Sequence, residues 1–160
     1  MKRILIAVLM AMGFSNMVDA QQSIPMPQQQ PSVNTPSPPA AIHPGALYDA
    51  GLKFAQLIDA GQTATLWDNG STLIKRAVRR EDFLASVAKA RSTMGPLSSR
   101  TWRAVQHQYS SGAQGQQIPA GEYATVNFAI VAGGKPGTEA VTFRHDEDGV
   151  WRFVGYVIQR

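Results

Sequence analysis

Three consecutive acidic residues form the densest group that could bind a metal or act as an acid or base. Asp146, Glu147 and Asp148 run directly into Gly149, and Asp-Gly is a strong signal for a hairpin turn. A calcium loop also needs a glycine at its centre and a distal glutamate, which this segment lacks. We therefore interpret the three carboxylates as solvated turn residues.

The histidines and serines form no catalytic or metal-binding pattern. His43, His107 and His145 are far apart, and none has a second histidine at ligand spacing, so we expect no metal site. Without a G-x-S-x-G elbow, catalysis by a serine nucleophile has no support. The chain has no cysteine, which excludes disulfides, thiolate nucleophiles and thiolate metal sites. No cofactor is expected.

The densest basic group lies just before a predicted helix. It consists of Lys75, Arg76, Arg79 and Arg80. These cations could dock an acidic partner, a phosphate or an anionic lipid, or they could simply pair with Glu81 and Asp82. Because no aromatic residues are interleaved to stack on bases, we do not expect nucleic-acid binding.

Three arginines and several aromatic residues could form a ligand site. Arg91, Arg100 and Arg152 could pair with a glutamate or bind a carboxylate ligand. The binding surface that we expect is the concave face of the sheet, near Tyr123, Thr125, Arg152 and Tyr156.

An enzyme of the lyase or isomerase type would need a different arrangement. Its site would hold a buried carboxyl group with a shifted pKa beside a tyrosine. The acidic residues that could fill this role are Asp59, Glu122 and Glu139.

The first half of the folded region is predicted to be helical. Apolar residues at intervals of three and four predict a helix over 46–60 that ends at Gly61. A short helix is expected over 62–67, and Ser71 is a plausible N-cap for a turn over 72–74. Acidic residues in the first turn and Gly95-Pro96 at the end delimit another helix over 81–94.

After Pro96 the pattern changes to that of strands. Strands are expected over 101–109, 122–131, 138–145 and 150–158, and short connections between the last three indicate an antiparallel meander. The sequence therefore predicts an α+β domain, with N-terminal helices packed on a curved antiparallel sheet of about four strands.

A series of short motifs, in order over most of residues 46–158, resembles a known family. The motifs are Trp67, the run Arg91 to Gly95, Arg100, the run Ile118 to Tyr123, the run Glu139 to Thr142, and Asp148-Gly-Val-Trp151-Arg-Phe-Val-Gly155-Tyr156. Together they resemble the bacterial exported family known as domain of unknown function 4019, apart from Ile118, where a leucine is expected. The resemblance implies a small exported domain but no activity, substrate or catalytic residue. The order of elements is also similar to that of the cystatin-like and nuclear-transport-factor-like cone folds.

The N-terminus has the features of a cleavable export signal. Lys2 and Arg3 precede an uncharged apolar run over 4–14, and small residues lead up to Ala20, after which cleavage is expected. This run is short of the roughly 20 residues that span a membrane. Since no cysteine follows for lipidation, we expect a periplasmic or secreted protein without a stable membrane anchor.

A spacer is expected between the signal and the fold. Residues 21–44 are rich in Pro and Gln and contain no charged residue, so they cannot build helix or sheet ladders. The single folded domain should occupy 45–160. The net charge of +4 is too small and too scattered for a nucleic-acid binder.

These observations together favour a non-enzymatic periplasmic module that binds an unknown protein or small ligand. Two alternatives stay open, and each can be tested by a structure. The first is a cone-fold lyase or isomerase, which needs a carboxyl group in a pocket beside a tyrosine. The second is an inhibitor or immunity-type protein that caps another enzyme, for which the segment 75–80 is the first surface to inspect.

Overall fold

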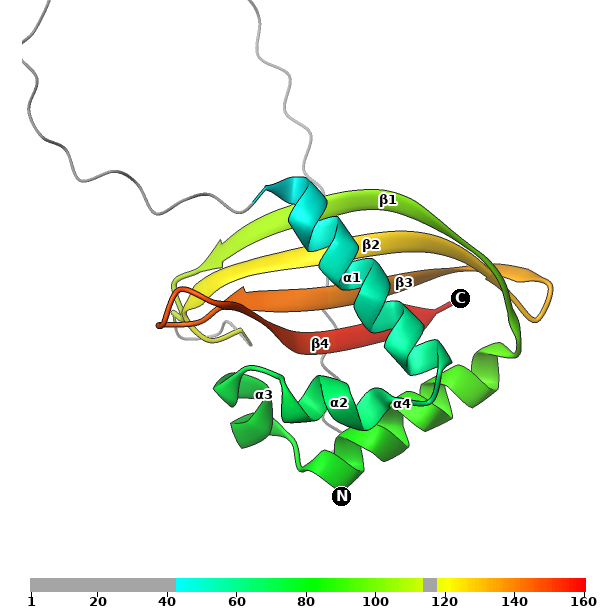
Figure 1. Cartoon of the computed structure of the whole chain (residues 1–160), viewed down its shortest axis with the longest axis horizontal. Coiled ribbons are helices and arrows are strands. Elements are labelled where there is room, and N and C mark those ends of the chain that lie inside the picture. Colours follow the sequence, from blue (N-terminus) through cyan, green and yellow to red (C-terminus); the bar gives the residue numbers. More distant parts are fainter. Residues whose placement is uncertain (1–42, 114–117) are drawn as a thin grey trace, which may run out of the picture. The chain divides into compact units, whose positions relative to one another are not determined.

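A computed structural model describes residues 43–113 and 118–160 of the chain. Within these residues four helices are followed by four strands (Figure 1). They are α1 (Pro44–Asp59), α2 (Thr63–Asp68), α3 (Thr72–Ala77), α4 (Arg80–Met94), β1 (Leu97–Ser110), β2 (Gly121–Ala132), β3 (Lys135–His145) and β4 (Trp151–Gln159). The strands form one antiparallel sheet in the order β1-β2-β3-β4. The predicted α+β class with a curved sheet is confirmed.

The helix boundaries follow the capping residues. Helix α1 begins at Pro44, two residues earlier than expected. Proline is tolerated at this position because the first N–H groups of a helix have no acceptor within the helix, so a missing N–H costs no hydrogen bond. His43 caps it by accepting a hydrogen bond from the Gly45 N–H at 3.1 Å. Ser71 accepts from the Leu73 N–H at 3.2 Å, which confirms the predicted N-cap, and α3 continues to Ala77. The predicted signal peptide (1–20) and spacer residues 21–42 lie outside the described residues.

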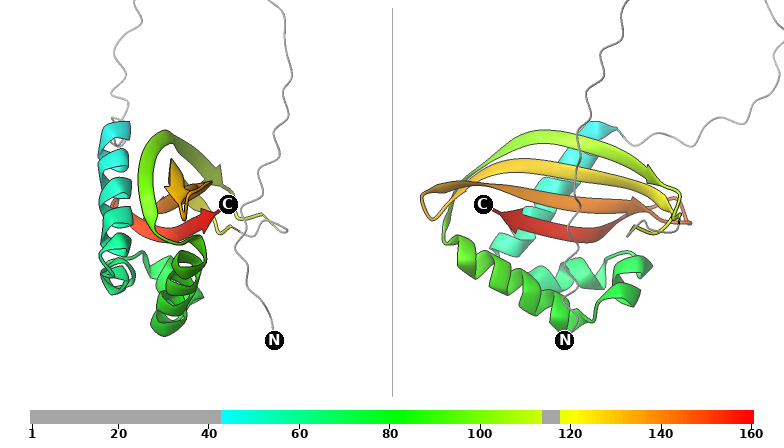
Figure 2. Two further views of the ribbon diagram at one scale, coloured as in Figure 1. Left: turned by 90° about the vertical axis from the view of Figure 1, so that its right-hand side faces the viewer. Right: turned by 180° about the vertical axis from the view of Figure 1, so that it is seen from behind.

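The helices pack on one face of the sheet. Helix α1 crosses the strands, whereas α4 runs beside β4, and Figure 2 shows the same arrangement from two further sides. Directly opposed residues of an antiparallel sheet share a face. The helix face therefore includes Trp102, Val105, His107 and Tyr109 of β1; Glu122, Ala124, Val126, Phe128 and Ile130 of β2; Glu139, Val141, Phe143 and His145 of β3; and Trp151, Phe153, Tyr156 and Ile158 of β4. The other face, here called the open face, includes Tyr123, Thr125, Asn127, Thr142, Arg144 and Arg152.

The sheet curls toward its helix face. His107 lies on β1 and Trp151 on β4, with two strands between them, yet their ring centroids are only 5.6 Å apart. In a flat sheet these strands would be separated by roughly 14 Å, since neighbouring strands lie about 4.8 Å apart. The helix face is therefore the concave one and the open face is convex.

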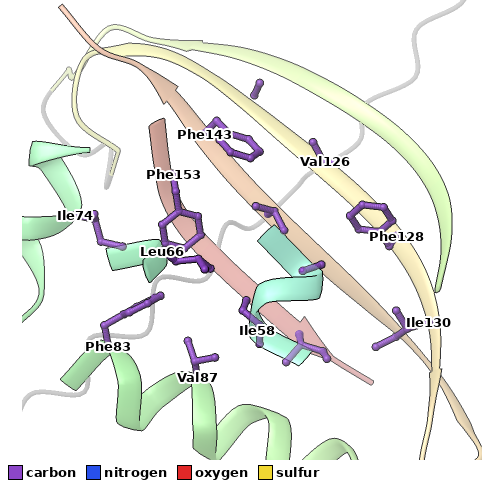
Figure 3. Close-up of a cluster of buried hydrophobic side chains, with 14 of the residues drawn as sticks. Ile58, Leu66, Ile74, Phe83, Val87, Val126, Phe128, Ile130, Phe143 and Phe153 are labelled. Carbon is purple, nitrogen blue, oxygen red and sulfur yellow. The ribbon is translucent and has the colours of Figure 1, made fainter. Parts of the chain in front are cut away.

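The core lies between the concave face and the helices (Figure 3). Phe153 stacks on Phe54 of α1 at 5.6 Å and meets Phe83 of α4 edge-on at 5.7 Å. Phe54 also meets Phe143 edge-on at 5.3 Å, so one aromatic group links β3 and β4 to two helices. The predicted strand alternation from Ala124 to Ile130 and the buried stripe of α4 are confirmed by burial.

Gly51 sets how closely α1 approaches β2, and its replacement is expected to destabilise the fold. A Cβ atom at this position would lie 2.8 Å from Val126 Cβ and 2.9 Å from both Val126 methyl groups. Gly51→Ala should therefore lower the free energy of unfolding by about 1–3 kcal/mol, although alanine favours helix. Val126→Ala removes two of the three clashing atoms, so the double variant should lose less than the sum of the single losses in urea unfolding. Strict additivity would contradict this close approach.

Candidate functional site

A buried ionic network joins five side chains from five elements. Asp59 of α1, Arg91 of α4, Arg100 of β1, Glu139 of β3 and Tyr156 of β4 are all in contact, and we call them the Glu139 network. The Glu139 side chain is fully buried, and Arg100 is almost so. Asp59 lies closest to the surface. Helix capping and strand register bring these residues together from across the chain.

Both carboxylate oxygens of Glu139 are engaged. Oε1 accepts from the Tyr156 hydroxyl at 2.7 Å, from Arg100 at 3.2 Å and from Arg91 at 3.4 Å. Oε2 accepts from Arg100 Nε at 2.5 Å. Asp59 bridges the same two arginines, accepting from Arg100 Nη1 at 2.8 Å and also pairing with Arg91. Two carboxylates thus balance two guanidinium groups.

The electrostatics of this network favour a structural role over proton transfer. Burial opposes the charge of Arg100, but hydrogen bonds to Asp59 and Glu139 outweigh it and raise the pKa of Arg100. Burial and then the Glu139 charge raise the pKa of Tyr156, so its hydroxyl stays protonated and donates. A carboxylate beside a tyrosine, as the lyase or isomerase hypothesis requires, is therefore present. Its oxygens, however, are occupied by arginines and are not free to take a proton from a substrate.

Two pockets flank this network without reaching Glu139. One, of about 450 Å³, lies between α1, α2 and α4 and has Asp59 and Arg91 among its otherwise mostly apolar lining. The other, of about 260 Å³, lies between α4 and β4 and includes Tyr156 and Phe83. Since neither lining includes Glu139, the buried carboxylate has no contact with either pocket.

The predicted binding set, Tyr123, Thr125, Arg152 and Tyr156, is not one surface. The first three lie on the open face, but Tyr156 lies on the helix face. The cause is a register shift: Phe153 pairs with Phe143, whereas Gly155 pairs with the neighbouring Thr142, so one extra residue reverses the alternation of β4. The open face is also convex, which corrects the expectation of a concave surface there.

The three residues that stay on the open face have partners within the fold. Tyr123 is buried and its hydroxyl donates to the Pro119 carbonyl at 3.0 Å. Thr125 shares a hydrogen bond with Thr142 at 3.1 Å. Arg152 donates to both oxygens of Asp148 at 2.7 Å. Their part in ligand binding stays a prediction.

The acidic turn is only partly solvated, which corrects the sequence interpretation for Asp146. Its carboxylate is buried and accepts from Ser71 Oγ at 2.6 Å, from Arg144 at 2.8 Å and from Arg152 at 3.3 Å. Ser71 also donates its backbone N–H to the Phe153 carbonyl. Through its hydrogen bond from Ser71, Asp146 connects the start of α3 to the end of β3. Glu147 and Asp148 are exposed.

Glu147 gives an expected pH dependence. Hydrogen bonds from Arg144 lower its pKa from the usual 4.5 to about 2. A lowered folded-state pKa stabilises the fold above the unfolded pKa and loses this effect as pH falls through the folded one. The melting temperatures of the wild type and Glu147→Gln should therefore differ above pH 5 and converge toward pH 2. A thermal series in low salt measures this, and 1 M salt should shrink the difference at neutral pH because exposed charges are screened. A gap that widens in acid would contradict the Arg144 contact.

The basic group over 75–80 is largely paired with nearby acids. Arg79 contacts Asp82 at 2.7 Å and Glu81 at 3.1 Å, and Arg80 contacts Asp68 at 2.8 Å. Lys75 donates to the Asp68 carbonyl and lies over the Trp67 ring. The charge of Arg76 contributes to lowering the pKa of Glu147. This pairing supports the structural interpretation of the group, and its docking role stays a prediction.

The exposure of two aromatic side chains on β1 could not be predicted from the sequence. Trp102 and Tyr109 both lie on the helix face with 52% and 77% of their surface exposed. Tyr109, Glu122, His145 and Trp151 form one row across all four strands. His145 stacks on Trp151 at 5.1 Å, and Glu122 lies between His145 and His107. Only the strand register reveals this row, because its members are scattered in the sequence.

Comparison with known proteins identifies a family and no activity. A family model described as "Protein of unknown function (DUF4019)" matches residues 50–156. No curated protein and no solved structure matches the chain. Over residues 43–113 and 118–160, no helix is long and apolar enough to reach across a membrane. The same residues contain no group of three acidic or histidine side chains that could hold a metal ion.

Proposed function

Because the chain belongs to the DUF4019 family, whose name carries no activity, we propose a function from this chain's own geometry. The chain is an exported, non-enzymatic module that binds an extended protein segment by adding a strand to β1. The observation that carries this proposal is the long outer edge of β1 with its two exposed aromatic residues.

Strand β1 has the features of an edge that accepts another strand. It has 14 residues, whereas most strands have about 5–6. Natural edges are usually blunted by prolines, charges or bulges, and both register shifts of β1 lie before Ala104, so its half from Ala104 to Ser110 is regular. β1 contains neither proline nor an acidic residue, and Arg103 is its one exposed arginine. No described strand pairs with its outer edge. An added strand would gain backbone hydrogen bonds there, and the exposed aromatic residues would contribute apolar contact.

The opposite edge is not equivalent. Strand β4 is packed by α4, and its Phe153 carbonyl accepts a hydrogen bond from the Ser71 N–H at 2.8 Å. Its backbone is thus partly engaged by the start of α3. This asymmetry favours β1 as the edge that binds.

Export is part of the proposal, with residues 1–20 removed and residues 21–42 forming a spacer. Its support is the charged start, the apolar run and the small residues before Gln21. Fractionation of the cells and N-terminal sequencing should find the protein outside the cytoplasm, starting at Gln21. A cytoplasmic protein that retains Met1 would overturn export and leave strand addition to be tested separately.

Two alternatives have less support. The lyase or isomerase hypothesis needs a free carboxyl group, and Glu139 is held by Arg91 and Arg100. An inhibitor or immunity-type protein would use an exposed patch, but Arg79 and Arg80 are paired with nearby acids. The exposed aromatic residues of β1 are the stronger protein-binding feature, because interfaces are enriched in tryptophan and tyrosine.

Photo-crosslinking in cells that produce the full chain tests strand addition. A photoreactive amino acid at Gln108, an exposed position of β1, should give a covalent protein adduct. The same group at Lys89, an exposed position of α4, is the matched control and should give none. Trp102→Ala combined with Tyr109→Ala should reduce the Gln108 adduct several-fold. Equal adducts from both positions, or none from Gln108, would overturn the proposal.

A further inference from the structure

We infer that the strand added to β1 is β1 of a second copy of this chain, paired antiparallel about a twofold axis at Gln106. This inference rests on the proposed function and names its partner. The two four-stranded sheets would join into one sheet of eight strands. An interface of this kind is isologous, so the same strand must be complementary to itself.

The faces of β1 restrict the register. Opposed residues in an antiparallel pair share a face, so an axis between two residues would set concave-face side chains against open-face ones. The axis must therefore pass through a residue. β1 also has a register shift between Trp102 and Ala104, which adds one residue and puts both Trp102 and Tyr109 on the helix face, seven positions apart.

An axis at Gln106 makes the aromatic ends meet. Ala104 then faces Gln108 of the second copy, and Val105 faces His107 of the second copy. The next residue, Tyr109, lies opposite the register shift of the second copy. Because Arg103 is the extra residue there, Tyr109 faces Trp102 of the second copy. Symmetry repeats this pair at the other end, so the four most exposed aromatic side chains of the dimer cover one another. Cross-strand aromatic pairs are among the stabilising pairs of antiparallel sheets.

Neighbouring registers lack this match. An axis at His107 sets the two copies of His107 against each other and Tyr109 against Val105. Counted in the same way, an axis at Val105 sets His107 against Trp102 of the second copy and Tyr109 against Arg100, which is already paired with Asp59 and Glu139. With the axis at Gln106, no two charged side chains of like sign face each other. The self-complementarity of β1 about this one residue is the reason to choose a second copy over an unrelated protein.

The absence of cysteine makes the register directly measurable. We would prepare Val105→Cys, Gln106→Cys and His107→Cys and oxidise each purified protein under mild conditions. With the axis at Gln106, the two Cα atoms of residue 106 lie about 4.5–5.5 Å apart, within disulfide range. Residue 105 of one copy faces residue 107 of the other, so two cysteines at position 105, or two cysteines at position 107, would not face each other. Gln106→Cys should therefore form the linked dimer at least tenfold faster than the other two.

A second pair of variants protects the test against misfolding. Asn127 donates to the Gln106 side chain at 3.0 Å, so circular dichroism must show that Gln106→Cys folds. Ala104→Cys mixed with Gln108→Cys should give a linked heterodimer, because these two positions face each other. Sedimentation of the wild type should show a dimer that dissociates on dilution. Trp102→Ala with Tyr109→Ala should shift it to monomer.

The outcomes separate this inference from the proposed function. A Gln108 photo-adduct of twice the chain mass, together with fastest linking at 106, supports both. A Gln108 adduct with a different protein, and no dimer in sedimentation, overturns the second copy but leaves strand addition at β1. Fastest linking at 105 or 107 overturns the register, and a dimer that none of the cysteines links overturns β1 as its interface. No adduct and no dimer overturn both proposals.

Discussion

Glu139→Ala is expected to lower the free energy of unfolding by about 3–5 kcal/mol, because breaking a buried ion pair leaves its partner charges uncompensated. Arg100 loses its contacts to both Glu139 oxygens, and Tyr156 loses its acceptor. A domain of this size is stable by only about 5–15 kcal/mol in total. Urea unfolding followed by tryptophan fluorescence and circular dichroism would measure the loss.

Two variants define what this loss means. Glu122→Ala removes a half-exposed carboxylate that contacts His145 at 3.2 Å and His107 at 3.7 Å, and should cost less than about 1 kcal/mol. Replacing Glu139 and Arg100 together, by leucine and methionine, should recover part of the loss because Arg91 keeps its pairing with Asp59. If Glu139→Ala cost no more than Glu122→Ala, the carboxylate would not be held as the structure shows.

The elements themselves could be predicted from local signals. Glycine and capping residues marked the helix ends, so the N-cap at Ser71 and the end of α4 before Gly95 agree with the structure. Alternation along β2 identified its buried face correctly. These signals depend only on residues a few positions apart, so a single sequence is enough to predict the helices and strands.

The faces of β4 could not be predicted, because a bulge inserts one residue without a sequence signature. Simple alternation groups Tyr156 with Arg152, and the register shift between Phe153 and Gly155 separates them. The same limit concealed the row from Tyr109 to Trp151, since it depends on the register of three strand pairs. A surface that spans several strands depends on the register of every strand pair in it, which local sequence does not specify.

The charged residues behaved similarly. The sequence indicates that Arg91 and Arg100 could pair with a glutamate, but not that one buried carboxylate, Glu139, receives both guanidinium groups. The sequence predicts that Asp146 is solvated like its neighbours, because a turn tip is usually exposed. The contact with Ser71, 75 positions away in the sequence, buries it instead. Such long-range contacts follow from the packing of the elements and not from their local sequence.

Phe153→Ala is expected to be as damaging as the loss of Glu139, for a different reason. The side chain is fully buried and lies toward Phe83 of α4 (Figure 3), and its ring also stacks on Phe54 of α1. Replacing a core phenylalanine by alanine costs about 3–5 kcal/mol. The free energy gained by burying the ring is lost, and a cavity is left in the core. The midpoint of urea unfolding should fall accordingly.

The matched control lies on the same strand. Val157→Ala shortens an exposed side chain of β4 and should change stability by less than about 0.5 kcal/mol. Because Phe153 and Phe54 are in contact, the double variant Phe54→Ala/Phe153→Ala should lose less than the sum of the single losses. Additive losses would mean that the two rings act independently. Phe153 would then not join α1 to the sheet, and α1 would depend on its approach to β2 at Gly51 instead.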